Sequence, residues 1–379
     1  MTGKISVLMP RLLLSAIMTM ALFSCPAQAF QNGPASVAPI AKKLVDAVVN
    51  ISTSQTVKGP SGVPLPKVPK GAPFEDFFDD FFNKRGGVPN SDRKISSLGS
   101  GFVIDGKEGL IVTNNHVIEG AEEIEINFHD GSKLKVDKVL GRDTKADLAL
   151  LKVTPKKPLS DVKFGPSATL EVGDWVMAIG NPFGLGGSVS LGIISAKSRD
   201  INSGPYDDYL QTDAAINKGN SGGPLFNMDG EVIGVNTAII SPTGGSIGIG
   251  FAVPSDTVAN VVDQLKQFGE VRRGWLGVKV QSVTDDIAET LGVPENSGAL
   301  IAAVTPESPA AKAGLEAGDV ILKFDNKDVT SMRGLPRIVA QAPIGKAADV
   351  ELLRKGQRKT LQVTVGRLDD GDDTESELK

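Results

Sequence analysis

The chain has 379 residues, of which 40% are hydrophobic and 22% charged, and its formal net charge at pH 7 is −5. This length predicts two or three domains, and the balance of apolar and charged residues is typical of a globular protein. The negative charge and the lack of a basic stripe argue against nucleic-acid binding. The 43 glycines and 23 prolines favour a turn-rich β protein over a helical one.

Residues 1–29 have the features of a signal peptide. Lys4 and Arg11 supply the positive charge, an apolar core spans 12–23, and Ala27-Gln28-Ala29 is a cleavage site of the A-x-A type. A permanent N-terminal anchor is the alternative, but this core is shorter than the ~20 apolar residues that a spanning helix needs. We therefore expect an exported protein without a stable membrane span.

Cys25 is the only cysteine of the chain. The segment 22–25 has a faint likeness to a lipoprotein processing site, but Phe23 stands where a small residue is usual. Cleavage after Ala29 would leave no cysteine, and therefore neither a disulfide nor a cysteine-based metal site.

The next stretch, 30–57, begins as a polar linker and continues as an apolar segment over 41–51. Residues 58–94 form an insertion that is rich in Pro, Gly and charged residues and contains a cluster of aromatic residues: Phe74, Phe77, Phe78, Phe81 and Phe82. On an ordinary helix, phenylalanines at this spacing would belong to the core. The flanking Pro and Gly favour a loop that docks on an apolar surface, and packing on its own domain is the alternative.

Short β-branched runs alternate with turn signals from Gly99 to about Val253. Many short strands at nearly regular spacing are typical of an all-β barrel or sandwich. We expect strands at Gly101–Asp105, Leu110–Thr113, Glu123–Phe128, Lys133–Leu140, Leu148–Val153, Trp175–Gly180, Gly187–Ser198, Tyr209–Asp213, Glu231–Ile240 and Gly248–Ala252.

The chain contains two histidines. His116 follows a strand-like run, whereas His129 lies in Phe128-His129-Asp130-Gly131, a hairpin-turn signal where a solvated imidazole is expected. His116 is therefore the candidate general base. Asp147, at the head of an apolar strand, is the candidate for the carboxylate that orients the imidazole. Asp143 competes with it, although its Gly-Arg-Asp setting resembles an exposed turn.

Ser221 lies between glycines in the segment 217–225, at the end of an apolar stretch. Glycine permits positive φ and lets a substrate carbonyl approach the main chain. The N–H groups of Gly219 and Ser221 could then form an oxyanion hole beside a serine nucleophile. An ordinary tight loop uses the same residue types, so this segment alone leaves both interpretations open.

The chain order of these residues separates the possible folds. In α/β-hydrolases the histidine follows the nucleophilic serine, whereas both histidines precede Ser221 here. The order His116, Asp147, Ser221 is that of chymotrypsin-like double β-barrels, with the site between two barrels. A Ser–Lys dyad of Ser160 and Lys163 remains formally open, but so short a match occurs by chance.

Five segments follow one another along the chain: T-N-N-H-V at 113–117, A-D-L-A-L-L-K-V at 146–153, G-N-P-F-G at 180–184, G-N-S-G-G-P-L at 219–225, and N-T-A-I-I with G-I-G-F-A-V-P within 236–254. In these segments the chain resembles the HtrA/Deg family of serine proteases, and the resemblance covers most of residues 40–366. Five such segments in the expected order identify a family far more specifically than a single motif does. The resemblance implies a trypsin-like double-barrel domain over 30–271.

The resemblance implies further properties. The region 30–57 would contribute to a homotrimer, which could join into larger assemblies, and the insertion 58–94 would regulate the active site across subunits. The substrate pocket would be apolar and shallow, and no metal or cofactor would be required. Ala215, six residues before the nucleophile, would form the floor of this pocket, and its other residues would be Ile216, Ile239 and, nearby, Ile249.

Residues 255–270 have the pattern of a capped amphipathic helix that ends the protease domain. The region 272–366 resembles one PDZ module, an α+β domain that binds a peptide C-terminus as an extra strand. Its carboxylate-binding loop and the strand after it would be formed by Trp275, Leu276, Gly277 and Val278. A groove helix is expected over 332–340, and Pro336 must lie in its first turn or kink it.

A packing domain without a ligand is the alternative for this module. Residues 367–379 contain six acidic residues and are expected to form a disordered tail. Together these features predict an exported, periplasmic serine endopeptidase that degrades unfolded or misfolded proteins of the cell envelope, with the PDZ domain capturing substrates or sensing their ends. The alternative is a binding protein or chaperone whose protease site is largely at rest.

Overall fold

The computed structural model describes residues 33–57, 93–181, 187–217, 219–242, 244–284, 288–289 and 298–368. Three expectations fall outside these residues: the signal peptide over 1–29, the insertion 58–94 except its last two residues, and the acidic tail from 369 onward. None of the helices in the described ranges is long and apolar enough to cross a membrane.

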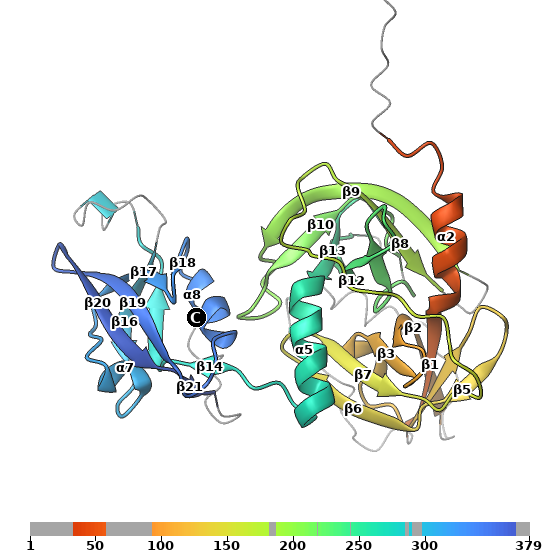
Figure 1. The fold of residues 1–379 in the computed structure, drawn as a ribbon, viewed down its shortest axis with the longest axis horizontal. Coiled ribbons are helices and arrows are strands. Elements are labelled where there is room, and N and C mark those ends of the chain that lie inside the picture. The colour runs from red at the N-terminus through yellow and green to blue at the C-terminus, as the bar shows by residue number, and fades with distance from the viewer. Residues whose placement is uncertain are drawn as a thin grey trace, which may run out of the picture. The chain divides into compact units, whose positions relative to one another are not determined.

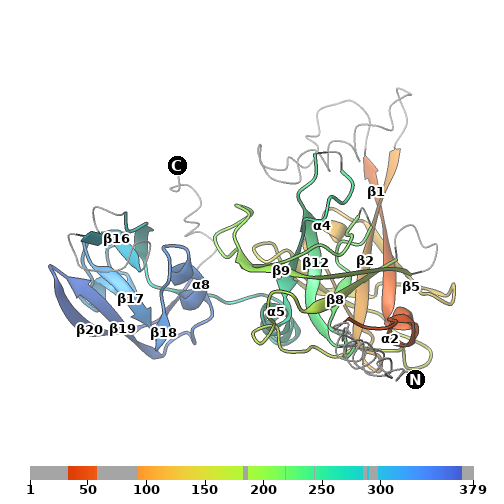
Figure 2. The same ribbon diagram turned by 90° about the horizontal axis from the view of Figure 1, so that it is seen from above.

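The first barrel is an open, seven-stranded antiparallel sheet with the order β5-β4-β1-β2-β3-β7-β6. Figure 2 shows β1 and β2 side by side, and their pairing runs from Val48 with Phe102 to Val57 with Arg93. Its core consists of fully buried aliphatic side chains such as Ile51, Ile111 and Leu151. The strands are β1 Val48–Val57, β2 Arg93–Asp105, β3 Leu110–Thr113, β4 Glu123–Asn127, β5 Lys133–Lys135, β6 Lys138–Asp143 and β7 Leu148–Lys152.

The second barrel is closed, with the strand order β10-β13-β12-β11-β8-β9. Its core includes Val176, Leu225 and Ile233. The strands are β8 Trp175–Gly180, β9 Ser188–Arg199, β10 Tyr209–Thr212, β11 Pro224–Phe226, β12 Val232–Ile239 and β13 Gly250–Pro254.

Helices connect and cover these barrels. The amphipathic helix α5, Ser255–Phe268, contacts β12 and β13 of the second barrel and β6 and β7 of the first, so it lies across both (Figure 1). It ends at Gly269, whose φ of 75° suits a residue without a side chain. The chain before β1 forms α2 Ala38–Leu44 and the 3-10 turn η1 Val45–Ala47, and the turn after β3 forms α4 Asn115–Ile118.

The C-terminal region folds into a small α+β domain. A five-strand path β15-β16-β17-β19-β20 carries β18 on β17, and β14 pairs separately with β21. Its core includes Leu276, Phe324 and Val350. The elements are β14 Gly274–Trp275, β15 Val278–Gln281, β16 Ala299–Val304, α7 Pro309–Lys312, β17 Val320–Phe324, β18 Lys327–Asp328, α8 Gly334–Ala340, β19 Ala347–Arg354, β20 Gln357–Thr364 and β21 Gly366–Arg367.

The predicted fold class, mostly β with two barrels and an α+β domain, is confirmed, and the first barrel is a half-barrel. Pro336 lies in the first turn of α8, as its ring requires. The strand expected over 133–140 is interrupted, because the N–H groups of Val136 and Asp137 turn to the carbonyls of Ile124 and Lys152. The strand β1 and the three-residue β11 were not predicted.

Candidate active site

His116 lies on the short helix α4, directly after the buried strand β3. Its Nδ1 lies 2.5 Å from Oδ2 of Asp147, and its main-chain N–H donates to Oδ1 of the same carboxylate at 2.8 Å. The imidazole and the carboxylate are both about one-fifth exposed, with relative areas of 20% and 22%. Two bonds from one residue therefore fix the plane of the carboxylate and the orientation of the ring.

The surroundings shift the proton affinity of this imidazole. Burial acts to lower the pKa of His116, but the charge of Asp147 and its hydrogen bond, helped by Glu119, act in the opposite direction and prevail. The pKa of His116 is therefore raised above its ordinary value of 6.5. The imidazole of His116 therefore holds a proton more readily than a free histidine does.

The backbone around Ser221 makes a sharp turn. Gly219 and Gly222 have φ values of 96° and 83°, which side chains rarely tolerate. A Cβ atom on Gly222 would lie 2.3 Å from the carbonyl oxygen of Ser100 and 2.4 Å from Oγ1 of Thr113. Because Thr113 precedes His116 by three residues, this close approach brings the Ser221 turn of the second barrel against the segment that carries the imidazole.

Ser100 of β2 holds the same turn from the other side. Its N–H donates to the Ser221 carbonyl at 2.9 Å, and its hydroxyl donates to the Gly219 carbonyl at 2.6 Å. Both carbonyls are thus directed into the protein. Within the described residues, the N–H groups of Gly219 and Ser221 have no acceptor in the protein, so both can bind an external oxygen.

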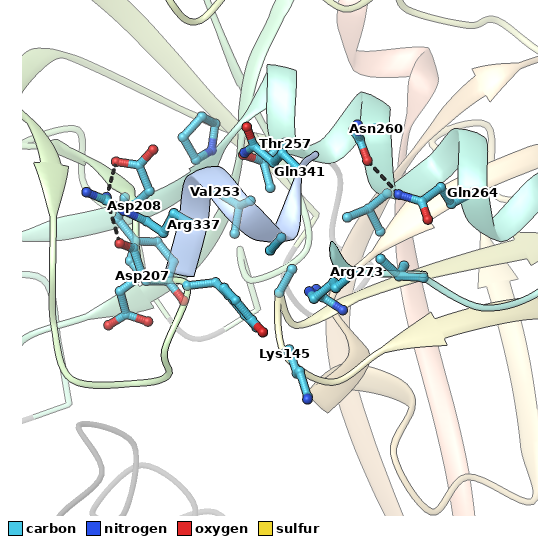
Figure 3. A pocket seen from close by; sticks show the side chains of 17 residues that line it. Lys145, Asp207, Asp208, Val253, Thr257, Asn260, Gln264, Arg273, Arg337 and Gln341 are labelled. Atoms are coloured by element: carbon cyan, nitrogen blue, oxygen red, sulfur yellow. Dashed lines mark hydrogen bonds and ion pairs between the residues drawn. The ribbon is translucent and has the colours of Figure 1, made fainter. Parts of the chain in front are cut away.

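Asp143 is not in an exposed turn, so the sequence interpretation of its setting was wrong. Its side chain is 4% exposed, and Oδ2 accepts from the Arg273 guanidinium at 2.5 Å. The partner Arg273, which also stacks on Tyr206, lines a pocket with Lys145 and Gln264 (Figure 3). Asp143 is therefore committed to an ion pair, and the carboxylate that reaches His116 is that of Asp147.

The competing histidine and the competing Ser–Lys pair both lie on the surface. His129 is exposed on the hairpin between β4 and β5, and Ser160 and Lys163 are both exposed. Among the described residues, no group of three or more His, Cys, Asp or Glu side chains is placed to hold a metal ion.

The residues expected in the substrate pocket differ in their exposure in the second barrel. Ile216 is buried in the barrel core, Ile239 packs against the same cluster, and Ile249 is half-buried. The main-chain N–H of Ile240 donates to the carbonyl of Ile249 at 3.1 Å, so the ends of the loop between these two residues are hydrogen-bonded to each other. Ala215 is exposed, and its carbonyl accepts from Ser190 at 2.9 Å.

The candidate peptide-binding loop of the C-terminal domain turns at Gly277, which has a φ of 78°. Leu276 before it is buried in the domain core, whereas Trp275 and Val278 are half-buried. The following strand β15 lies at an end of its sheet and pairs only with β16 among the described strands. Its outer edge is thus available to another extended segment.

Comparisons with known proteins agree with these features. The model of the trypsin-like peptidase domain matches residues 99–235, and that of the PDZ domain matches residues 245–365. A relative from Brucella suis biovar 1 (strain 1330), named "Probable periplasmic serine endoprotease DegP-like", is 44% identical over 359 residues, with 88% of this chain and 69% of the relative covered. The chain belongs to the HtrA/DegP-like family of periplasmic serine endoproteases.

Further relatives agree with this membership. A protein of the same name from Pseudomonas fulva (strain 12-X) is 46% identical over 346 residues, covering 88% of this chain and 71% of the relative. The solved structure "HtrA-type protease AlgW with tripeptide" is 37% identical, has a TM-score of 0.71, and covers 89% of this chain and 99% of that one. The predicted family, enzyme class and periplasmic location are thereby confirmed.

The residues that hold the site together were not predicted from the sequence. Ser100 and Asn236 support the Ser221 turn, since the N–H of Gly222 donates to the Asn236 carbonyl at 2.8 Å. Asn114 bonds to Asp147 through its side chain. The sequence offered one signal for this group: Asn114 directly precedes Asn115-His116, at a position where asparagine commonly caps a helix.

Proposed function

We propose that His116, Asp147 and Ser221 are the catalytic triad of this HtrA-type endoprotease. Ser221 attacks the peptide carbonyl, His116 takes its proton and returns it to the leaving amine, and Asp147 holds the ring in the required tautomer. The 2.5 Å contact between His116 and Asp147, with the Ser221 turn packed against the segment that carries His116, is the observation that supports this proposal. The N–H groups of Gly219 and Ser221 would stabilise the oxyanion.

The proposed substrates are unfolded or misfolded proteins of the cell envelope. An extended chain is what such a site requires, because the peptide must lie along the strands beside Ser221 to present its carbonyl.

We further propose that the chain assembles as a homotrimer, with larger assemblies possible, and that the insertion 58–94 regulates the site. The mass of the purified protein, measured with and without an unfolded client, tests the assembly.

Digestion of casein tests the proposed reaction on unfolded chains. Purified protein is expected to degrade casein and to leave a stable folded protein intact, because only the unfolded chain can extend into the site. The same preparation is then tested for its ability to prevent the aggregation of a client. Suppression of aggregation without any cleavage would favour the chaperone alternative over the endoprotease proposal.

We predict cleavage after small or medium aliphatic residues such as Val, Ala and Ile. Ala215 is exposed and carries no charge to receive Lys or Arg, the half-buried Ile239 and Ile249 supply apolar surface, and the buried Ile216 lies in the same apolar cluster as Ile239. One methylene changes binding in such a pocket by ~1–3 kcal/mol, so a preference is expected rather than strict selection. Mass spectrometry of casein fragments measures it, and mainly basic or aromatic residues before the cleaved bond would contradict this pocket.

We also propose that the PDZ domain binds the free C-terminus of a peptide. Gly274 and Gly277 bracket Trp275 and Leu276, so the main chain can turn successive N–H groups toward one carboxylate. The outer edge of β15, with which no described strand pairs, supports the addition of a peptide strand.

This PDZ proposal predicts a clear contrast between two peptides. A peptide with an apolar last residue should bind with a Kd of roughly micromolar, or ~8 kcal/mol, while its C-terminally amidated form should bind far more weakly. The titration uses the full-length Ser221→Ala protein, so that neither peptide is cleaved. Equal binding of the two peptides would mean that this loop does not recognise the carboxylate.

A further inference from the structure

Asn114 stands at the position that caps the helix carrying His116, yet its side chain makes no capping hydrogen bond. Asp147 takes that role. Its Oδ1 accepts from the N–H of His116, and its main-chain carbonyl accepts from the N–H of Asn115 at 3.1 Å. The side-chain oxygen of an asparagine at such a position normally accepts a hydrogen bond from an N–H of the first helical turn. Here the Asn114 side chain does not cap the helix and contacts other groups.

The Asn114 amide group instead donates in two directions. Nδ2 lies 2.7 Å from the main-chain carbonyl oxygen of Asp147 and 3.1 Å from Oγ1 of Thr237. The Thr237 hydroxyl already donates to the Val235 carbonyl at 2.9 Å, so toward Asn114 it can only accept. Both neighbours are thus acceptors, and they fix the amide orientation. Asn114 is fully buried, and within the described residues its Oδ1 has no partner.

The bond to Asp147 falls on a backbone that is otherwise unfavourable. Asp147 has a φ of 52°, a left-handed conformation that is uncommon for residues other than glycine. Its carbonyl direction is fixed by two donors, the side chain of Asn114 and the N–H of Asn115. The conformation that points the carboxylate at His116 therefore depends in part on this amide.

The bond to Thr237 leads to the second barrel. Thr237 belongs to β12, and its neighbour Asn236 accepts the N–H of Gly222, the residue after Ser221. One buried amide thus joins Asp147 of the first barrel to the strand that supports Ser221 in the second.

We propose that Asn114 is a positioning residue, which holds the backbone of Asp147 and sets the His116–Asp147 pair in register with Ser221. This inference rests on the proposed catalytic triad. Asn114 touches neither substrate nor a reacting atom in this role, and it acts only through Asp147 and Thr237.

Two substitutions test the donor role of the amide. Asn114→Ala should lower kcat on a fluorogenic peptide by about 10- to 100-fold with little change in KM, because a small misplacement of catalytic groups costs that much in rate. Asn114→Asp keeps the shape but replaces the donor by a carboxylate that faces the Asp147 carbonyl, so its loss should be at least as large. In Asn114→Ala the acidic limb of the kcat/KM profile should also move to lower pH, because a displaced Asp147 stabilises the protonated imidazole less.

Thr237 provides a second, independent pair of variants. Thr237→Ser keeps the hydroxyl and should retain kcat within about threefold, whereas Thr237→Val removes the acceptor and should lower it. Combined with Asn114→Ala, the Thr237→Val change should add much less than its separate effect, because both remove the same contact. Asn127→Ala is the matched control: this amide also makes two hydrogen bonds, to Asn50 and Ser52, and should leave kcat within about twofold.

The outcomes distinguish this inference from the proposal on which it rests. If Ser221→Ala and His116→Ala retain activity, the catalytic assignment itself fails. If those two are inactive while Asn114→Ala and Asn114→Asp keep kcat within about twofold, only the role of Asn114 fails. The role also fails if kcat falls in Asn114→Ala without a shift of the acidic limb, or if Thr237→Ser and Thr237→Val behave alike.

Discussion

Ser221→Ala is expected to lower kcat for peptide-bond cleavage by on the order of 10⁶-fold, the loss seen when a serine protease loses its nucleophile. The change deletes one hydroxyl from a half-buried turn whose hydrogen bonds are made by the main chain, so the melting temperature and the binding of unfolded protein should be unchanged. Casein cleavage, thermal unfolding and client binding are measured on the same preparation.

The matched control is Ser160→Ala, which removes the same hydroxyl from an exposed serine of the competing Ser–Lys pair. It should cleave casein at the wild-type rate. If Ser160→Ala were inactive and Ser221→Ala active, the nucleophile would have been assigned to the wrong serine.

Asp147→Asn is expected to lower kcat by about 10⁴-fold, since an asparagine cannot hold the imidazole in the required tautomer. The pH dependence should change with it. In the wild-type protein kcat/KM rises as His116 loses its proton, and the raised pKa of His116 places this acidic limb above pH 6.5. Without the Asp147 charge, burial lowers the pKa of His116 against only the smaller opposing influence of Glu119, so the limb should move to lower pH.

The control for this shift is Asp143→Asn. It leaves the nearly buried guanidinium of Arg273 without its partner and should lower the melting temperature, because an uncompensated buried charge destabilises a fold by about 3–5 kcal/mol. The acidic limb should stay where it is in the wild type. Movement of the limb by Asp143→Asn and not by Asp147→Asn would assign the orienting carboxylate to the wrong residue.

Much of the fold could be predicted because its evidence is local. Short β-branched runs and the turn residues between them identified strands such as Leu110–Thr113 and Trp175–Gly180 with their observed bounds. The strand β11 was missed because three residues are too few to show a period. The five segments and their order indicated the family, the order of His116, Asp147 and Ser221 indicated the two barrels, and the region 272–366 indicated the PDZ domain by its own resemblance.

The details of the site were less accessible because they depend on residues far apart in the chain. Asp143 could be recognised as buried only through Arg273, which follows it by 130 residues. The two acceptors of Asn114 lie 33 and 123 residues away, so its role has no local signature beyond an asparagine before a short helix. His116 was accessible from sequence because only two histidines exist and the other lies in a hairpin.

Covalent labelling of the nucleophile tests the central assignment most directly. A fluorophosphonate reacts with a serine that a neighbouring base has activated, so incubation followed by peptide mass mapping locates the modified residue. We predict one adduct, on Ser221, in the wild-type protein and in His129→Ala, and none in His116→Ala. An adduct on another serine, or undiminished labelling of Ser221 in His116→Ala, would contradict the proposed triad.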